Sequence, residues 1–166
     1  AEEVELILNG KSLGKQQVVY ADDAMPYFKV PYQDGRLEAR AYVNGIVVAH
    51  TLLETPRELK KIKLTTAALP RVIEDPSVLI IDLELVDKNG TLLNGKDEEV
   101  DFIVDESLNL LGVENADQSN HRSYTDTTQS TYKGKLRAYF KKTSKAGELK
   151  IIPKNKKLKT LSYTVK

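Results

Sequence analysis

Five turn dipeptides divide the first 95 residues of the chain into short segments. Asn-Gly occurs at 9–10, 44–45, 89–90 and 94–95, and Asp-Gly occurs at 34–35. These residues tolerate the positive φ angles of tight hairpin turns. The segments between them are rich in Val, Ile, Leu, Tyr and Thr, which is typical of strands. The spacing therefore predicts antiparallel hairpins.

Polar and apolar residues alternate along several of these segments. Residues 36–43 alternate in this way, and residues 79–86 place Leu79, Ile81, Leu83 and Leu85 opposite Ile80, Asp82, Glu84 and Val86. A period of two indicates a sheet with one packed and one solvated face. The expected strands are 3–8, 16–20, 27–31, 36–43, 46–54, 60–66, 78–86, 98–104, 108–114, 135–142, 147–152 and 158–165. No stretch gives a convincing helix, so the fold class is all-β.

A domain boundary is expected near residues 55–57, because Pro56 cannot donate to a strand ladder. We predict two tandem immunoglobulin-like β-sandwich modules, 1–57 and 58–166. The second has the size of a complete sandwich. The first is short, with a thin core. It either lacks its N-terminal strand, which would leave residues 4–8 as an unpaired edge, or leans on its neighbour.

Charge is distributed unevenly along the chain. Residues 133–166 hold 12 Lys and Arg against one acidic residue, whereas residues 58–132 hold 7 against 15. The basic residues largely alternate with apolar ones, so we interpret them as strand faces that balance acidic strands of the same domain rather than as a nucleic-acid surface. No apolar run approaches the roughly 20 residues that a membrane span needs, so membrane insertion is not expected.

The chain offers few groups for catalysis. It has no Cys and only two His residues, His50 and His121, which fall in different predicted domains. Glycoside hydrolysis needs two carboxylates about 5–10 Å apart across a sugar cleft. The pairs Asp97/Glu99 and Asp105/Glu106 lie in acidic turn regions, where solvation explains them. We therefore expect no catalytic residues, no cofactor and no His-based metal cluster.

A segment that begins at Asp87 superficially resembles a calcium loop. Its glycine, Gly90, falls at position four instead of six, and strands rather than helices flank it. An EF-hand is therefore rejected. A looser calcium site among Asp87, Asp97 and Glu98 stays open as an alternative.

Two stretches in the first domain carry a family resemblance. Residues 4–15, VELILNGKSLGK, resemble the VELFLNGKSLGK hairpin of the immunoglobulin-like domain that follows the catalytic barrel in many glycoside hydrolase family 2 enzymes. Residues 29–42 are similar to that domain's WVPYxxGxLxAxAY segment, although the Trp is absent. In the family a strand normally precedes this hairpin. Together with the absence of an initiator Met, this indicates a piece of a longer protein.

The second domain resembles the bacterial C-terminal immunoglobulin-like domain of the same enzymes. Residues 80–90 match its VxVEVVDxNG strand and turn, and residues 111–117, LGVENAD, match IVGVDNGD with Glu for Asp and Ala for Gly. The resemblance implies a non-catalytic scaffold region of a bacterial β-galactosidase-like glycosidase, with the catalytic barrel as its partner. An extracellular or cell-envelope location is then favoured. Alternatives are a carbohydrate-binding module and an immunoglobulin-like spacer of a cell-surface protein.

The polar stretch 115–131 is too long for a simple hairpin and is the candidate functional loop. Sugar sites combine aromatic faces with amide and carboxylate groups. The candidate contacts with carbohydrate or with another domain are Asn115, Asp117, His121 and Tyr124, together with Tyr32 in the first domain. The alternative interpretation is that the aromatic residues fill core or interdomain space and that the loop is merely solvated.

Overall fold

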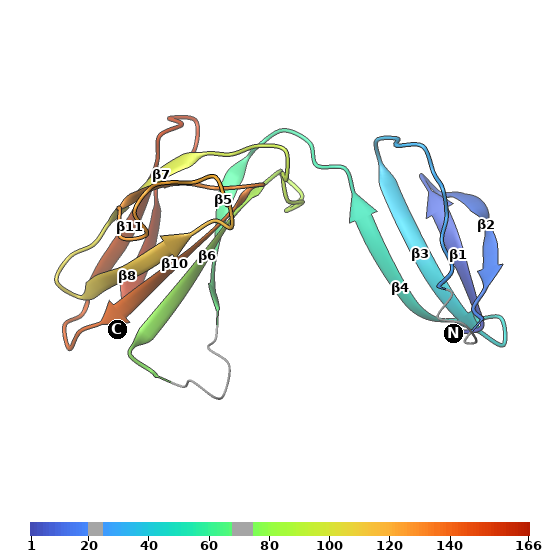
Figure 1. Cartoon of the computed structure of the whole chain (residues 1–166), viewed down its shortest axis with the longest axis horizontal. Coiled ribbons are helices and arrows are strands. Elements are labelled where there is room, and N and C mark those ends of the chain that lie inside the picture. The colour runs from blue at the N-terminus through green and yellow to red at the C-terminus, as the bar shows by residue number, and fades with distance from the viewer. Residues whose placement is uncertain (20–24, 68–74) are drawn as a thin grey trace. The chain divides into compact units, whose positions relative to one another are not determined.

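The computed structural model describes residues 1–19, 25–67 and 75–166. It divides into two compact units, Ala1–Thr55 (unit 1) and Pro56–Lys166 (unit 2) (Figure 1). Regular structure in the described residues consists of β-strands, which confirms the all-β prediction. These residues form no helix of the length and apolar character that crossing a membrane requires.

Unit 1 contains one antiparallel sheet in the order β2-β1-β3-β4. The strands are β1 (Glu3–Leu8), β2 (Lys11–Gln17), β3 (Arg36–Val43) and β4 (Ile46–Glu54). Asn9 and Gly10 turn between β1 and β2 with φ angles of 51° and 82°, and Asn44 and Gly45 turn between β3 and β4 at 50° and 76°. Both turns thus use the positive φ angles that the dipeptides predict.

Three expectations for unit 1 are wrong. Residues 27–31 form no strand. The second strand begins at Lys11 instead of residue 16, because the tight turn at Asn9 and Gly10 lets the chain pair back onto the first strand directly after the turn. Residue 20, the end of that expected strand, lies outside the described residues. β1 is central, since it pairs with β2 and with β3. The free edges are therefore β2 and β4 rather than residues 4–8.

The core of unit 1 is thin, as its short length predicts. Among its described residues, Ile7 and Tyr42 are the buried hydrophobic side chains. All nine residues of β4 are exposed, including Ile46 and Leu53, which are 69% and 68% exposed. Large apolar side chains at this exposure lack the second sheet that a sandwich packs against them.

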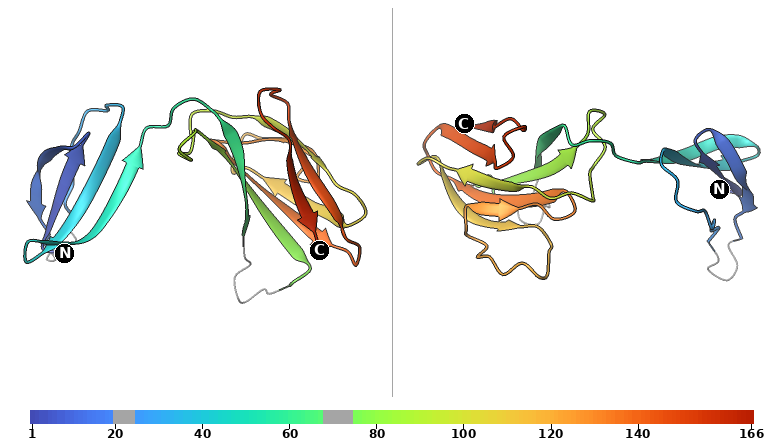
Figure 2. Two further views of the ribbon diagram at one scale, coloured as in Figure 1. Left: turned by 180° about the vertical axis from the view of Figure 1, so that it is seen from behind. Right: turned by 90° about the horizontal axis from the view of Figure 1, so that it is seen from above.

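Unit 2 is a sandwich of two four-stranded antiparallel sheets (Figures 1 and 2). The first has the order β5-β6-β10-β8, with β5 (Lys61–Ala67), β6 (Val78–Val86), β10 (Lys135–Lys142) and β8 (Leu108–Glu114). The second has the order β12-β11-β7-β9, with β12 (Leu161–Val165), β11 (Gly147–Pro153), β7 (Glu99–Ile103) and β9 (Thr128–Ser130). Seven of these strands match expected segments, while β9 falls inside the predicted loop.

The core of unit 2 lies between its two sheets. The inward residues predicted for β6, namely Leu79, Ile81, Leu83 and Leu85, all belong to it. Phe102 of β7 and Phe140 of β10 meet across the sandwich with ring centroids 5.9 Å apart and planes tilted by 59°. Ile80 and Val86, assigned to the solvated face, are also buried, at 5% and 0% exposure.

The basic strands pair with acidic ones, as the charge pattern predicts. Arg137 of β10 binds Asp82 of β6 through two hydrogen bonds of 2.6 and 2.8 Å. In the other sheet, Lys154 forms an ion pair with Asp101. Because each pair is partly exposed, its contribution to stability is small. With the ion pairs of Lys135 to Glu84 and of Lys145 to Glu106, these pairs neutralise part of the basic surplus of residues 133–166 within unit 2.

Candidate functional site

The candidate loop connects β8 to β9 and takes its shape from short polar side chains. The Asn115 side-chain oxygen accepts a hydrogen bond from the N–H of Asp117 at 3.0 Å, and the Asp117 carboxylate accepts one from the N–H of Ser119 at 3.0 Å. Asn120 and Asp126 accept bonds from the N–H two residues further on in the same way. Asn and Asp favour such turns because their side chains mimic the backbone. Consecutive turns of this kind order the loop without regular structure.

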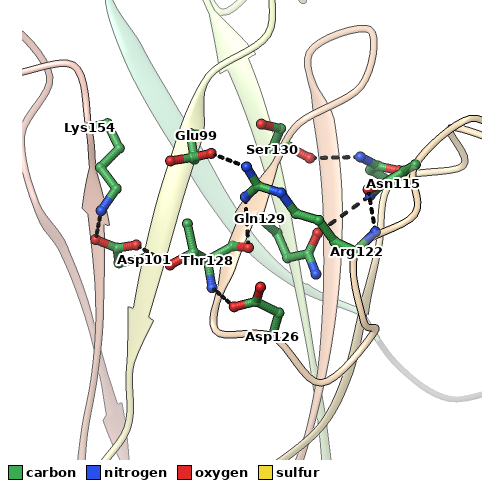
Figure 3. Close-up of polar contacts among 10 residues, drawn as sticks. Glu99, Asp101, Asn115, Arg122, Asp126, Thr128, Gln129, Ser130 and Lys154 are labelled. Atoms are coloured by element: carbon green, nitrogen blue, oxygen red, sulfur yellow. Dashed lines mark hydrogen bonds and ion pairs between the residues drawn. The ribbon is translucent and has the colours of Figure 1, made fainter.

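Hydrogen bonds between residues further apart in the sequence hold the loop against the second sheet (Figure 3). Arg122 reaches Glu99 of β7 at 2.6 Å and the carbonyl of Thr128 at 3.1 Å. Asn115 donates to the carbonyl of Ser130 at 2.9 Å, and the side chain of buried Gln129 donates to the carbonyl of Ser123 at 2.7 Å. The loop therefore holds its polar side chains in fixed positions.

A polar cleft of about 380 Å³ opens between this loop and the start of β7. We call it the loop cleft. Its lining comes from three separate segments: Asp97, the loop residues Asn115, Asp117, Ser119, Asn120, His121 and Arg122, and finally Ser130 at the end of β9 with Thr131 and Tyr132 directly after it. Carboxylate, amide, imidazole, guanidinium, hydroxyl and phenol groups thus converge on one space.

Three of the five sequence-predicted contact residues, Asn115, Asp117 and His121, line the loop cleft. Tyr124 does not line it. Its side chain is 72% exposed, and its carbonyl accepts a bond from the N–H of Val113 at 2.7 Å. Tyr32 belongs to unit 1, where it is 82% exposed and donates to Asp34 at 2.7 Å. Its role as a contact residue stays a prediction.

Sequence reasoning missed Asp97, Arg122 and Tyr132 as parts of this site. The reason is β9, whose inward side chain is the buried polar residue Gln129 instead of an apolar one. A three-residue polar strand gives no hydrophobic alternation. Without the pairing of β9 with β7, the sequence offers no reason to bring Asp97 beside the loop, whereas Arg122 and Tyr132 lie in or next to the predicted loop and carried no signal that singled them out.

Local hydrogen bonds favour the ionised form of Asp117. The Ser119 hydroxyl and N–H lower the pKa of Asp117, although partial burial opposes them, and the charge of His121 adds to the lowering. Asp97 uses one oxygen to accept bonds from the N–H of Gly134 at 3.1 Å and the hydroxyl of Thr131 at 3.3 Å. The cleft therefore presents two acidic acceptors, and the guanidinium of Arg122 in its lining is paired with Glu99.

Ala116 stands in the loop with a φ angle of 63°, in the left-handed region that favours glycine. We expect Ala116→Gly to raise the free energy of unfolding of unit 2 by about 0.5–1 kcal/mol, because glycine relieves this strain. Urea denaturation measures the change. Ala146→Gly is the matched control, because Ala146 is exposed and has no positive φ. The idea is wrong if Ala116→Gly destabilises unit 2 as much as Ala146→Gly does.

Outside the cleft, the carboxylates considered for catalysis or calcium have structural partners. Glu99 binds Arg122, and Asp105 accepts the N–H groups of Ser107 at 2.8 Å and Glu148 at 2.9 Å. The nearby Ser107 hydroxyl and these two N–H groups lower the pKa of Asp105 to about 2.

Asp87 is 1% exposed and also has a structural role. Its carboxylate accepts the N–H groups of Arg57, Asn89 and Thr91. Burial by itself raises the pKa of Asp87, but these backbone groups outweigh it and hold the pKa below its usual value. The described residues contain no group of three or more His, Asp or Glu that could hold a metal ion.

Comparison with known proteins identifies the family. Residues 62–164 match the model of the glycoside hydrolase family 2 C-terminal domain 5, and residues 1–49 match a domain of unknown function, DUF4982. The chain is 26% identical over 151 residues to the beta-galactosidase BoGH2A of Bacteroides ovatus, covering 91% of this chain and 18% of that protein. A Formosa agariphila protein provisionally named a beta-glucuronidase is 29% identical over 154 residues, 92% of this chain and 15% of its own length.

Solved structures give the same result. A family 2 member from Bacteroides cellulosilyticus superposes with a TM-score of 0.85 at 30% identity, over 99% of this chain and 23% of that one. A beta-glycosidase from Bacteroides vulgatus superposes at 0.81 and shows the shared fold. The chain thus spans less than a quarter of the length of these relatives, and the match over residues 62–164 shows that it belongs to the glycoside hydrolase family 2 C-terminal domain 5 family.

Proposed function

We propose that the chain acts as a non-catalytic accessory region of a larger family 2 glycosidase whose catalytic domain lies elsewhere in the polypeptide. The observation that carries this proposal is the match to a C-terminal domain, in relatives of which the chain covers only 15–18%. These relatives are glycosidases, which favours the accessory role over a spacer of a cell-surface protein.

The two units have different parts in this proposal. Unit 2 is a complete immunoglobulin-like sandwich, supported by its two four-stranded sheets and a single core. Unit 1 is a partial domain of the same kind, supported by its single sheet and by the exposed apolar side chains of β4. Strands from elsewhere in the longer protein cover that sheet and complete its core.

The chain is expected to release no nitrophenol from nitrophenyl β-galactosides or β-glucuronides above the spontaneous rate. The physical reason is that Glu99 and Asp105 are engaged as an ion-pair partner and a turn cap, whereas hydrolysis needs an acid and a nucleophile that are free to act about 5–10 Å apart. Purified protein and a colorimetric assay test this. Turnover that disappears in Asp97→Asn, Asp117→Asn or Glu99→Gln would overturn the proposal, because activity from a contaminating enzyme would not respond to any of these changes.

A further inference from the structure

We infer that the loop cleft binds a neutral pyranose sugar, an inference that rests on the proposed accessory role in a glycosidase. Its volume of about 380 Å³ lies at the lower end of the range of small-ligand pockets. A space of this size accommodates one or two sugar rings.

The cleft is preorganised. Asn115 and Arg122 are fixed by bonds to Ser130, Glu99 and Thr128, as Figure 3 shows. Because these contacts exist before any ligand arrives, binding does not have to order the loop. This lowers the entropic cost of association.

The remaining polar groups suit hydroxyl ligands. In the described part of the chain, each of Asp97 and Asp117 uses Oδ1 for its hydrogen bonds and leaves Oδ2 without one. The imidazole of His121 also makes no hydrogen bond to any described residue, and it lies on the same cleft. The two carboxylate oxygens can accept hydrogen bonds from adjacent sugar hydroxyls, and the imidazole can accept one hydrogen bond and donate one.

Tyr132 supplies an aromatic surface at the same cleft. Its side chain is half-buried, and the Nζ of Lys133 lies 5.3 Å from its ring centroid. An aromatic ring beside hydrogen-bonding groups matches a sugar, which has an apolar face of C–H groups and a polar rim.

The charges of the cleft disfavour other ligands. Asp97 and Asp117 repel a carboxylate, and the guanidinium of Arg122, which also lines the cleft, is already paired with Glu99, so a uronic acid is a poorer fit than a neutral hexose. A metal ion is a poor fit as well, because the described residues lack a cluster of three His, Asp or Glu ligands. The hydroxyl groups of a neutral sugar can donate hydrogen bonds to the Oδ2 atoms of Asp97 and Asp117 without charge repulsion.

The test is an amide-shift titration of the chain with methyl β-D-galactopyranoside, methyl β-D-glucopyranoside and sodium glucuronate. We expect shifts confined to residues 97, 115–122 and 130–132, with Kd of roughly millimolar for a neutral sugar and weaker binding of glucuronate. Asp117→Asn and Tyr132→Ala should each weaken binding about fivefold or more. Asp126→Asn and Tyr124→Ala are the matched controls, because both residues are exposed on the same loop but outside the cleft, and they should leave Kd unchanged within about twofold.

Three results would overturn the inference: no shifts up to about 50 mM of either neutral sugar, shifts centred on residues 27–32 of unit 1, or equal loss of affinity in the control variants. The variants also need native amide spectra, and Asp117→Asn provides the decisive comparison because it keeps the Oδ1 acceptor that caps Ser119. A flat titration would leave the accessory role standing, since that role is tested separately by the absence of glycoside turnover.

Discussion

Phe140→Ala is expected to lower the free energy of unfolding of unit 2 by about 3–5 kcal/mol. Phe140 is 0% exposed and packs against Phe102 of the opposite sheet, so its loss leaves a cavity at the centre of the sandwich. Because the chain has no Trp, urea unfolding is best followed by the amide signals of unit 2 in two-dimensional NMR spectra. Unit 1 signals in the same samples report any effect outside the sandwich.

A double-mutant cycle separates the ring contact from simple burial. Phe102→Ala and Phe140→Ala together should fall short of additivity by about 1 kcal/mol, since the tilted pair of rings is lost with either change. Ile103→Ala serves as the control: Ile103 neighbours Phe102 but is 50% exposed, and its replacement should cost less than about 1 kcal/mol. If Phe140→Ala lowers the free energy of unfolding no more than Ile103→Ala does, the two sheets do not pack as the structure places them.

Amide hydrogen exchange is expected to be at least about 100-fold faster in unit 1 than in the strands of unit 2. Ile7 and Tyr42 are the buried hydrophobic residues of unit 1, whereas the core cluster of unit 2 alone contains 16. An amide exchanges slowly when the opening of its hydrogen bond has to expose buried apolar surface. A single sheet whose strand β4 is exposed buries little such surface. Peptides from residues 1–19 and 36–54 should therefore exchange well before those from 78–86 and 135–142.

The comparison has to be made in a dilute, monomeric sample, because pairing of the exposed edge β4 with a second copy would protect unit 1. Val48→Lys provides a check, since a charge on that edge suppresses such pairing without removing a buried side chain. Equal protection of both units in a sample shown to be monomeric would contradict the expectation. It would mean that unit 1 is stable without further strands.

Local signals in the sequence located most strands of this protein. The Asn-Gly turns at 9–10 and 44–45 have the positive φ angles that these residues favour, and β3, β4, β6, β8 and β10 have the expected bounds. Such features depend on neighbours in the chain, where backbone sterics and alternation of side chains act directly. The turn at Gly10 also shows the limit of this reasoning: the second strand starts directly after it, although Lys11–Gln17 has little apolar character.

The pairing of strands that are distant in the chain could not be predicted from the sequence. Nothing local places β3 beside β1, yet this pairing makes β1 central and leaves β2 and β4 as the free edges of unit 1. β9 is stabilised by pairing with β7 and by the bonds of Gln129, not by burial of apolar side chains. Strand order is set by the sum of many long-range contacts, which no single stretch encodes.

For the candidate site, the sequence by itself determined that the loop after β8 is long, polar and rich in turn-forming residues, and it indicated Asn115, Asp117 and His121. The tertiary structure alone decided that Asp97 and Tyr132 complete the cleft and that Tyr124 lies outside it. The physical reason is that a loop's composition follows from local turn chemistry. The position of its side chains follows from the strands that anchor its two ends, and one of those strands, β9, exists only through its pairing with β7.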